Sequence, residues 1–295
     1  MWRRLGRGWS MARASFSVLK RYPRLTILPV ISTGVSLLVV GLLFLSLLPQ
    51  LPRLHALTGG VWQWLGEDSG RVWYFLALFV VVYALTAVAV FCNVALIHCA
   101  LRALAGEEAS IRGGLATASG RLPQILGWAL VVSTIGIALK VLHNFLENLG
   151  FIGELLGGVL EFGWSASTYF VVPVLAAEGV GPIAGIRRSA ALVRGKWGES
   201  LAGEGRFGLV TVLFLLQAAL VLVVGLSLTN EYGAGALIGP LVMALGVLYA
   251  LGAMMVLQAL NVIFQAGVYV YARTGRVPPA LDADLVAGAF RRKDA

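Results

Sequence analysis

The stretch VVPVLAAEGVGPIAGIRRSAALVRGKWGESLAGEG, residues 171–205, is the best starting point for the fold. An apolar run ends at Pro173–Ala177, and a glycine-rich turn follows at Glu178–Pro182. Beyond the turn, helical spacing separates an apolar face from a basic face. The apolar face holds Ile183, Ile186, Ala190, Val193 and Trp197, and the basic face holds Arg187, Arg188, Arg194 and Lys196. The stretch therefore predicts the end of a membrane span and a short helix on the membrane surface before the chain re-enters the bilayer.

The composition is that of a membrane protein. The chain has 295 residues, of which 59% are hydrophobic and 13% charged, and its mean hydropathy is +0.86. Soluble domains contain about 25% charged residues. The net charge of +9 is explained by basic loops on one membrane face, so we expect no nucleic acid as a partner. We expect residues 1–295 to form a single polytopic membrane domain.

A helix needs about 20 residues to cross roughly 30 Å of hydrocarbon, and six apolar runs are at least this long. They are Leu25–Leu48, Val72–Leu101, Leu122–Leu142, Leu155–Ala177, Phe207–Leu228 and Ala236–Tyr271. The second and sixth runs exceed this length, so these helices must tilt, kink or project from the bilayer. The sequence predicts an all-α membrane protein with six transmembrane helices.

The basic residues predict the orientation. All of them except Arg53, Arg71 and Lys140 lie in the N-terminal segment, around 102–121, around 187–206 or in the C-terminal tail. These four regions alternate with the other three connections, so they share one side of the membrane. By the positive-inside rule, both termini are cytoplasmic, and anionic lipids of the inner leaflet are expected partners.

An internal repeat is the next prediction. Amphipathic helices are expected around Trp9–Leu19, around Ile111–Leu122 and in the opening stretch, and each precedes two spans. Pseudo-repeats at about 8–106, 110–178 and 183–275, with a cytoplasmic tail at 276–295, give three parallel hairpins. Asn93-Val94 and Asn261-Val262 occupy similar places in the first and third units. The alternative is that any cytoplasmic loop beside a span tends to form a basic amphipathic helix.

No motif for catalysis or cofactor binding has its required context. Residues 203–208 spell GxGxxG, but the dinucleotide fingerprint needs a preceding strand, and this segment lies between spans. The histidines, His55, His98 and His143, lack ligand spacing. We therefore expect no enzyme activity, no nucleotide or other cofactor, and no metal.

Polar residues within the spans are better candidates, because each is costly in hydrocarbon without a partner or water. Lys140 and Glu161 lie ten residues before and eleven after Gly150, so they are at similar depth and are able to pair. Glu161, Ser165 and Thr168 share one helical face, which lines either a neighbouring helix or a wet cavity. The alternative is a structural pair, with Lys140 reaching the outer interface.

Side-chain amides form a second set of candidates. Gln258, Asn261 and Gln265 share a face of the sixth span, and Asn93 is the repeat equivalent in the second. Amides of this kind either bond neighbouring helices or line a solute path. At the cytoplasmic turn, Glu178 lies near Arg187 and Arg188, where an ion pair or helix cap is expected.

Two segments carry a family resemblance: residues 7–29, RGWSMARASFSVLKRYPRLTILP, and the VVPVL, EG, GP and RS elements of the opening stretch. They resemble an uncharacterised bacterial family of six-pass membrane proteins, known only as a domain of unknown function. The resemblance implies a bacterial cytoplasmic membrane and no particular activity. A weaker similarity links the Gly8-Trp9 helix to the sulfate permeases of cysteine synthesis, whose remaining pattern is mostly absent here.

These patterns lead to two hypotheses. The first is a non-enzymatic membrane protein that passes a small solute or ion, based on the parallel repeat and the polar faces of the fourth and sixth spans. The second is a structural or accessory subunit, or an assembly factor, of a larger membrane complex. Small-residue spacings such as Gly153-x3-Gly157 and Gly235-x3-Gly239 suit close helix packing within or between subunits, so a homo-oligomer is also expected.

Overall fold

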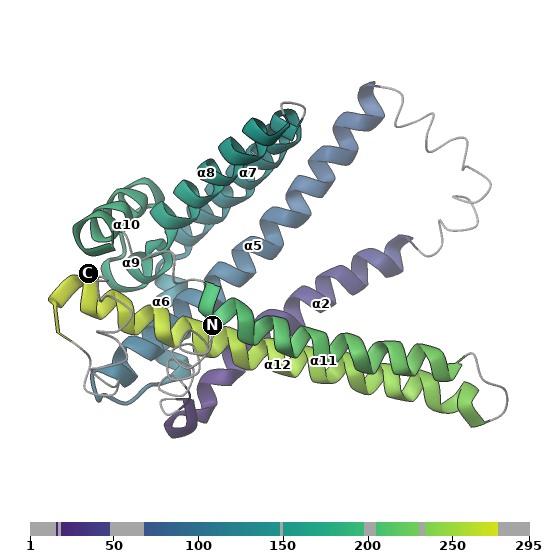
Figure 1. The fold of residues 1–295 in the computed structure, drawn as a ribbon. Helices are drawn as coiled ribbons and strands as arrows, with labels where there is room; N and C mark the ends of the chain where they lie inside the picture. Colours follow the sequence, from purple (N-terminus) through teal and green to yellow (C-terminus); the bar gives the residue numbers. More distant parts are fainter. Residues whose placement is uncertain are drawn as a thin grey trace, which may run out of the picture. The chain divides into compact units, whose positions relative to one another are not determined.

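The computed structural model describes residues 16, 19–47, 68–147, 150–197, 205–229 and 234–276, and all regular secondary structure in these ranges is helical (Figure 1). The predicted all-α fold is thus confirmed for this part of the chain. The elements are η1 (Pro23–Thr26), α2 (Ile27–Leu47), α5 (Asp68–Leu104), α6 (Ile111–Gly120), α7 (Leu122–Glu147), α8 (Phe151–Thr168), α9 (Val171–Glu178), α10 (Pro182–Trp197), α11 (Gly205–Thr229) and α12 (Ala234–Thr274).

Five helical segments in the described ranges are long and apolar enough to cross a membrane. They are Pro23–Leu42, Leu76–Leu104, Leu122–Leu146, Ile152–Glu178 and Ile238–Thr274. The predicted span Phe207–Leu228 falls on α11, whose fully described apolar part, Phe214–Thr229, is shorter than a span. The chain is therefore a multi-pass integral membrane protein, and the sixth span stays a prediction.

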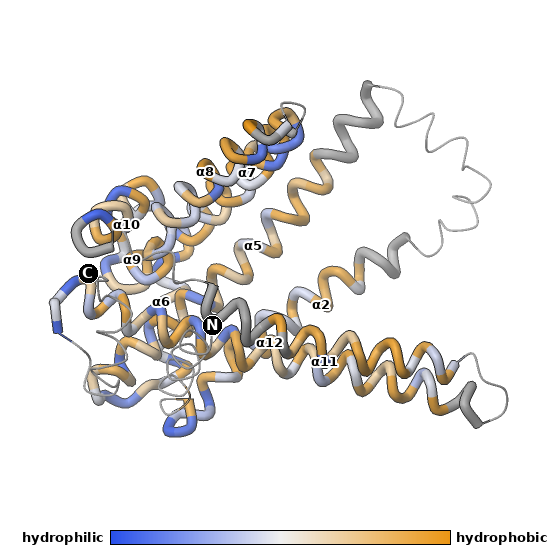
Figure 2. Tube along the Cα trace, viewed as in Figure 1, coloured by the Kyte–Doolittle hydropathy of each residue, from blue (hydrophilic) through white to orange (hydrophobic). Residues whose placement is uncertain are grey.

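Long stretches of α7, α8, α11 and α12 consist of apolar residues, coloured orange in Figure 2, and many large apolar side chains on the described helices are exposed. Leu38, Val141, Leu220 and Leu248 are each more than three-fifths exposed. A soluble protein rarely leaves so many large apolar side chains uncovered, whereas lipid tails solvate them well. The exposed shafts agree with the membrane assignment.

The chain divides into two compact units. Unit 1 comprises the described parts of Met1–Pro29, Leu96–Gly114 and Ala191–Ala295, and unit 2 those of Val30–Ala95 and Leu115–Ala190.

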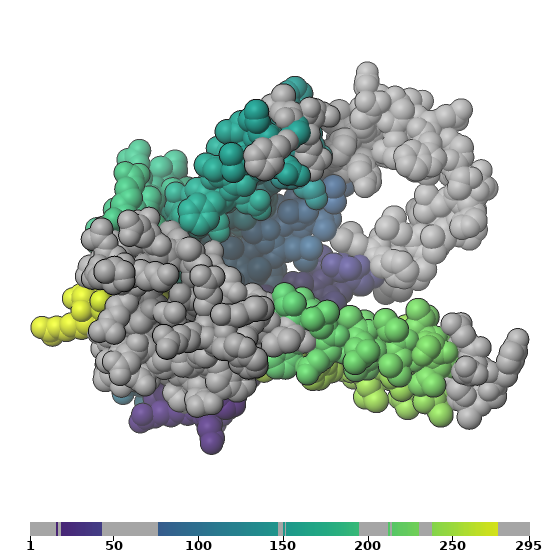
Figure 3. All heavy atoms as spheres, viewed as in Figure 1, coloured from purple at the N-terminus to yellow at the C-terminus, as the bar shows by residue number. Residues whose placement is uncertain are grey.

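In unit 1, α11 and α12 lie side by side as one green rod of atoms in Figure 3. A Cβ atom added to Gly239 would lie 2.6 Å from the backbone nitrogen of Thr229 and 2.7 Å from the carbonyl oxygen of Gly225. Glycine is needed there because the two backbones are in direct contact.

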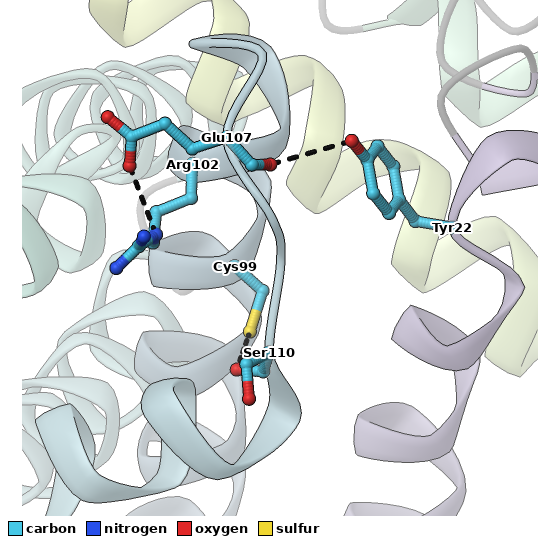
Figure 4. A network of polar contacts seen from close by, with 5 residues as sticks. All are labelled: Tyr22, Cys99, Arg102, Glu107 and Ser110. Carbon is cyan, nitrogen blue, oxygen red and sulfur yellow. Dashed lines mark hydrogen bonds and ion pairs between the residues drawn. The ribbon is translucent and has the colours of Figure 1, made fainter.

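Polar contacts in unit 1 join the N-terminal segment to the loop after α5 (Figure 4). The phenol of Tyr22 donates to the carbonyl oxygen of Glu107 at 3.5 Å, and Arg102 pairs with the Glu107 carboxylate at 3.1 Å. The Cys99 thiol donates to the carbonyl oxygen of Ser110 at 3.3 Å. Together these contacts hold the loop between α5 and α6 against the start of the chain's first span.

In unit 2, α7 and α8 are packed neighbours. The rings of Trp128 and Trp164 stack with centroids 6.2 Å apart, and Gly157 leaves room for the ring of His143. Tyr83 of α5 donates its hydroxyl to the carbonyl oxygen of Leu126 at 3.4 Å. α6 and α10 are the helices predicted before the third and fifth spans, whereas most of the one predicted before the first lies outside the described residues. The three-hairpin arrangement and the repeat stay predictions.

Candidate functional site: the broken fourth span

The fourth span is broken, contrary to the expectation of one helix over Leu155–Ala177. α8 ends at Thr168, the chain turns at Tyr169 and Phe170, and α9 begins at Val171. Pro173 explains the break, because proline has no N–H for the carbonyl four residues earlier and its ring clashes with that carbonyl. At the first turn of α9 the same proline is tolerated, since N–H groups there have no helical acceptor.

Helix α10 stabilises the break. The Phe170 N–H donates to the Ser189 hydroxyl oxygen at 3.0 Å, replacing the helical bond that the turn removes. Ser189 and Phe170 are both fully buried, as are Val171 and Val174. A Cβ atom on Gly185 would lie 2.9 Å from Leu175 Cδ1, so a small residue is required where α10 meets α9.

The C-terminal end of α9 is capped by residues around the start of α7. Gly179 ends α9 in the left-handed region, with φ of 67°, which favours glycine. Arg121 donates from Nη1 to the carbonyl oxygen of Leu175, and Gln124 Nε2 donates to that of Gly179 at 3.4 Å. A guanidinium at this position complements the negative end of the helix dipole. Burial lowers the pKa of Arg121 from its ordinary value, yet arginine stays protonated at neutral pH.

The turn between α9 and α10 holds an ion pair of the expected kind, between Glu178 and Arg188. Arg188 Nε lies 3.4 Å from the Glu178 carboxylate, with the Glu178 side chain one-fifth exposed and that of Arg188 about half exposed. Arg187 is exposed and lies on another side of α10. A pair this exposed contributes little stability, of order 0–1 kcal/mol.

The predicted polar face of α8 runs along the helix to the break. Glu161 and Ser165 are exposed, and the Thr168 hydroxyl donates to the carbonyl oxygen of Trp164 at 2.8 Å. Lys140, on α7, is exposed as well, and the described contacts include no ion pair between it and Glu161. The three polar residues thus share one face of α8, and no described ion pair joins Glu161 of this face to Lys140 of α7.

The predicted amide residues fall in different units. Asn93 belongs to unit 2, and Gln258, Asn261 and Gln265 belong to α12 in unit 1. Asn261 is exposed, whereas Gln258 and Gln265 are half-buried and have interaction partners, as does Asn93. Within each described unit, these partnered amides fit helix–helix bonding.

Sequence reasoning missed several polar groups. Arg121 was counted only among the basic residues around 102–121, and Gln124 was not singled out, although both cap α9. Gln124 Oε1 and the hydroxyl of Ser133 are buried without a hydrogen-bond partner in the described structure. A serine in an apolar run and a glutamine at a helix start are too common to stand out, so only tertiary contacts identify them. Among the described residues, no cluster of three or more His, Cys, Asp or Glu side chains could hold a metal ion.

Comparisons with known proteins give a family and no activity. No curated protein and no solved structure matches the chain. The sequence model of the Family of unknown function (DUF6159) matches residues 72–278, which is more than half of the 295 residues. The match includes the broken span, α10 and the second of the two segments on which the family resemblance rests, while residues 7–29 lie outside it. The chain belongs to the Family of unknown function (DUF6159).

Proposed function

We propose that the protein passes a small solute or ion along the polar face of α8 and has no enzymatic activity. The observation that carries this proposal is the face of Glu161, Ser165 and Thr168, which ends at the break in the fourth span. Broken membrane helices are typical of solute-binding positions, and uncovered polar side chains in a span are costly unless water or protein reaches them. A solute path satisfies both conditions.

Helix lengths put the two charges at the outer end of this path. Lys140 is 19 residues beyond Arg121, or about 28 Å at roughly 1.5 Å per residue. If Arg121 lies at the inner boundary of about 30 Å of hydrocarbon, Lys140 lies near the outer boundary. Glu161 is at similar depth, counted from the turn at Gly150. The pair would then flank the entrance, and Phe170 and Val171, both fully buried, would close the inner end.

A second function is favoured by the far end of the α7–α8 pair. Phe145 is 74% exposed and Ile152 66% exposed. α7 has 26 residues, so its length of about 39 Å exceeds the hydrocarbon thickness, and an upright helix would raise Phe145 beyond the acyl chains. A protein partner would cover these side chains, as expected for an accessory subunit or assembly factor of a membrane complex.

The finer topology is part of the same proposal. We place six spans in a bacterial cytoplasmic membrane, as three parallel hairpins with both termini cytoplasmic. The distribution of basic residues and the family resemblance support this topology. A homo-oligomer or a larger complex is supported by the exposed helix faces. The weaker similarity to sulfate permeases makes small inorganic anions the first solutes to test.

Flux into proteoliposomes tests the solute path. Purified protein would be reconstituted with radiolabelled sulfate, phosphate, chloride or potassium, and uptake compared with that of empty vesicles. Glu161→Gln and Ser165→Leu should lower uptake several-fold, because both alter the polar face. Glu108→Gln is the matched control, since Glu108 is an exposed glutamate in the loop after α5. Uptake equal to that of empty vesicles for every solute, with a fixed protein copurifying, would favour the accessory role instead.

A further inference from the structure

The packed face of α10 differs from the apolar face expected from the sequence. Gly185, Ser189 and Val193 are buried and recur every fourth residue, so this side of the helix faces protein. By contrast, Ile183 is 65% exposed. Small residues therefore make the protein contact of α10, and Ile183, Ile186 and Ala190 of the expected apolar face lie beside it.

The apolar residues beside the packed face form a narrow strip along α10. At about 100° per residue, Ile183, Ile186 and Ala190 fall within roughly 60° of one another, next to the packed face. Ile186 and Ala190 are half-buried and Ile183 is exposed. Arg187 and Arg194 border the strip on its other side and are both exposed. We call the three apolar residues together with the two bordering arginines the α10 strip.

The path of the chain places the α10 strip beside the membrane. The candidate span ends at Glu178, and three residues separate it from the first residue of α10. Three linking residues reach at most about 14 Å from one helix end to the next, and the contacts with α9 at Gly185 and Ser189 hold α10 nearer still. The helix is thus fixed at the end of a span with an apolar strip uncovered.

We propose that the α10 strip binds the bilayer surface and that Arg187 and Arg194 bind the phosphate groups of anionic phospholipids. Ile183, Ile186 and Ala190 would enter the boundary of the acyl chains, as in interfacial amphipathic helices. The arginine stems would cover apolar surface while their guanidinium groups donate paired hydrogen bonds to phosphate oxygens.

Charge distribution favours a lipid surface as the occupant. Arg188 is held by Glu178 on another side of the helix, whereas Arg187 and Arg194 make no ion pair among the described residues. Two exposed cations bordering an apolar strip match an anionic membrane surface, which attracts each basic residue. The proposal does not depend on the solute path, since it concerns only how α10 meets the bilayer.

Probe quenching at neighbouring positions tests where the strip lies. Ile183→Cys and Ala184→Cys variants, with Cys92 and Cys99 replaced by alanine, would carry an environment-sensitive fluorophore in vesicles of phosphatidylcholine and phosphatidylglycerol. Both positions are exposed, but consecutive residues point about 100° apart. Lipids spin-labelled near the headgroup should quench the probe at 183 strongly and that at 184 weakly. Equal lipid quenching at the two positions, or a probe at 183 shielded from both lipid and aqueous quenchers, would overturn the proposal.

Lipid preference tests the role of the arginines. The ratio of phosphatidylglycerol to phosphatidylcholine bound to protein extracted from mixed vesicles should fall about fivefold for each of Arg187→Gln and Arg194→Gln. Arg188→Gln removes the same charge from the same helix, but on the side that faces Glu178, so it should leave the ratio nearly unchanged. An equal fall in all three variants would contradict a defined lipid contact, as would an unchanged ratio in all of them.

Discussion

The backbone N–H of Phe170 donates to the side-chain oxygen of Ser189, 19 residues further along the chain, at 3.0 Å. Both residues are fully buried, and this hydrogen bond ties the break in the fourth span to helix α10. Backbone groups freed within a membrane protein must find partners in the protein itself. The break is therefore a fixed part of the fold and depends on α10 for its stability.

Replacing Ser189 with alanine should destabilise the protein by about 1–3 kcal/mol, because the buried Phe170 N–H loses its acceptor. Thermal unfolding in detergent, followed by circular dichroism, would measure the loss. Ser165→Ala is the control, since Ser165 is exposed and a change there should lie within about 0.5 kcal/mol. Equal unfolding temperatures for Ser189→Ala and the unmodified protein would show that another group accepts the bond.

Arg121→Ala should loosen the C-terminal end of α9. The carbonyl oxygen of Leu175 would keep only its bond from the Gly179 N–H, and a hydrogen bond to a charged group contributes about 1.5–3 kcal/mol. Hydrogen exchange at the amides of residues 175–180 should accelerate accordingly. Arg112→Ala in α6 serves as the comparison, because Arg112 is exposed. Unchanged exchange in the Arg121 variant would contradict its capping role.

Gly239→Ala should separate α11 from α12. The added methyl group would lie 2.5–2.7 Å from atoms of Thr229 and Gly225, two of them backbone atoms that cannot rotate away. Overpacking of this kind costs about 1–3 kcal/mol or more. Gly252→Ala, on the same helix with nothing within 4 Å of the new atom, should be neutral or stabilising by up to about 1 kcal/mol. Unfolding temperatures of the two variants would decide, and equal values would argue against the close approach.

The membrane helices were largely predictable from the sequence, since apolar runs and charged loops both mark their ends. The run expected from Leu122 begins where α7 begins, and Gly150 separates α7 from α8 as expected. The break at Tyr169 and Phe170 was not predicted, because Pro173 was assigned to the end of the span. In the sequence, a proline at the third position of a helix cannot be told from one at the end of the preceding helix. The hydrogen bond from the Phe170 N–H to Ser189 distinguishes the two cases.

The candidate site was predictable only in part. Helical spacing placed Glu161, Ser165 and Thr168 on one face, and adjacency placed Arg188 near Glu178. The packed face of α10 was not predicted, because Gly185 and Ser189 add little hydropathy, yet their small size allows the close approach to α9 and the turn before it. Arg121 and Gln124 donate hydrogen bonds to backbone carbonyl groups that lie far along the chain. No sequence pattern predicts hydrogen bonds of this kind.

Water accessibility along α8 tests the proposed solute path most directly, since it requires no knowledge of the solute. Single cysteines at positions 161, 165 and 162, without Cys92 and Cys99, would be treated in proteoliposomes with a charged, membrane-impermeant thiol reagent. Phe162 is the control, because it is 56% exposed beside Glu161 but turned about 100° away. A solute path predicts fast labelling at 161 and 165 and slow labelling at 162. Labelling at 165 as slow as at 162 would mean a dry face and would contradict the path.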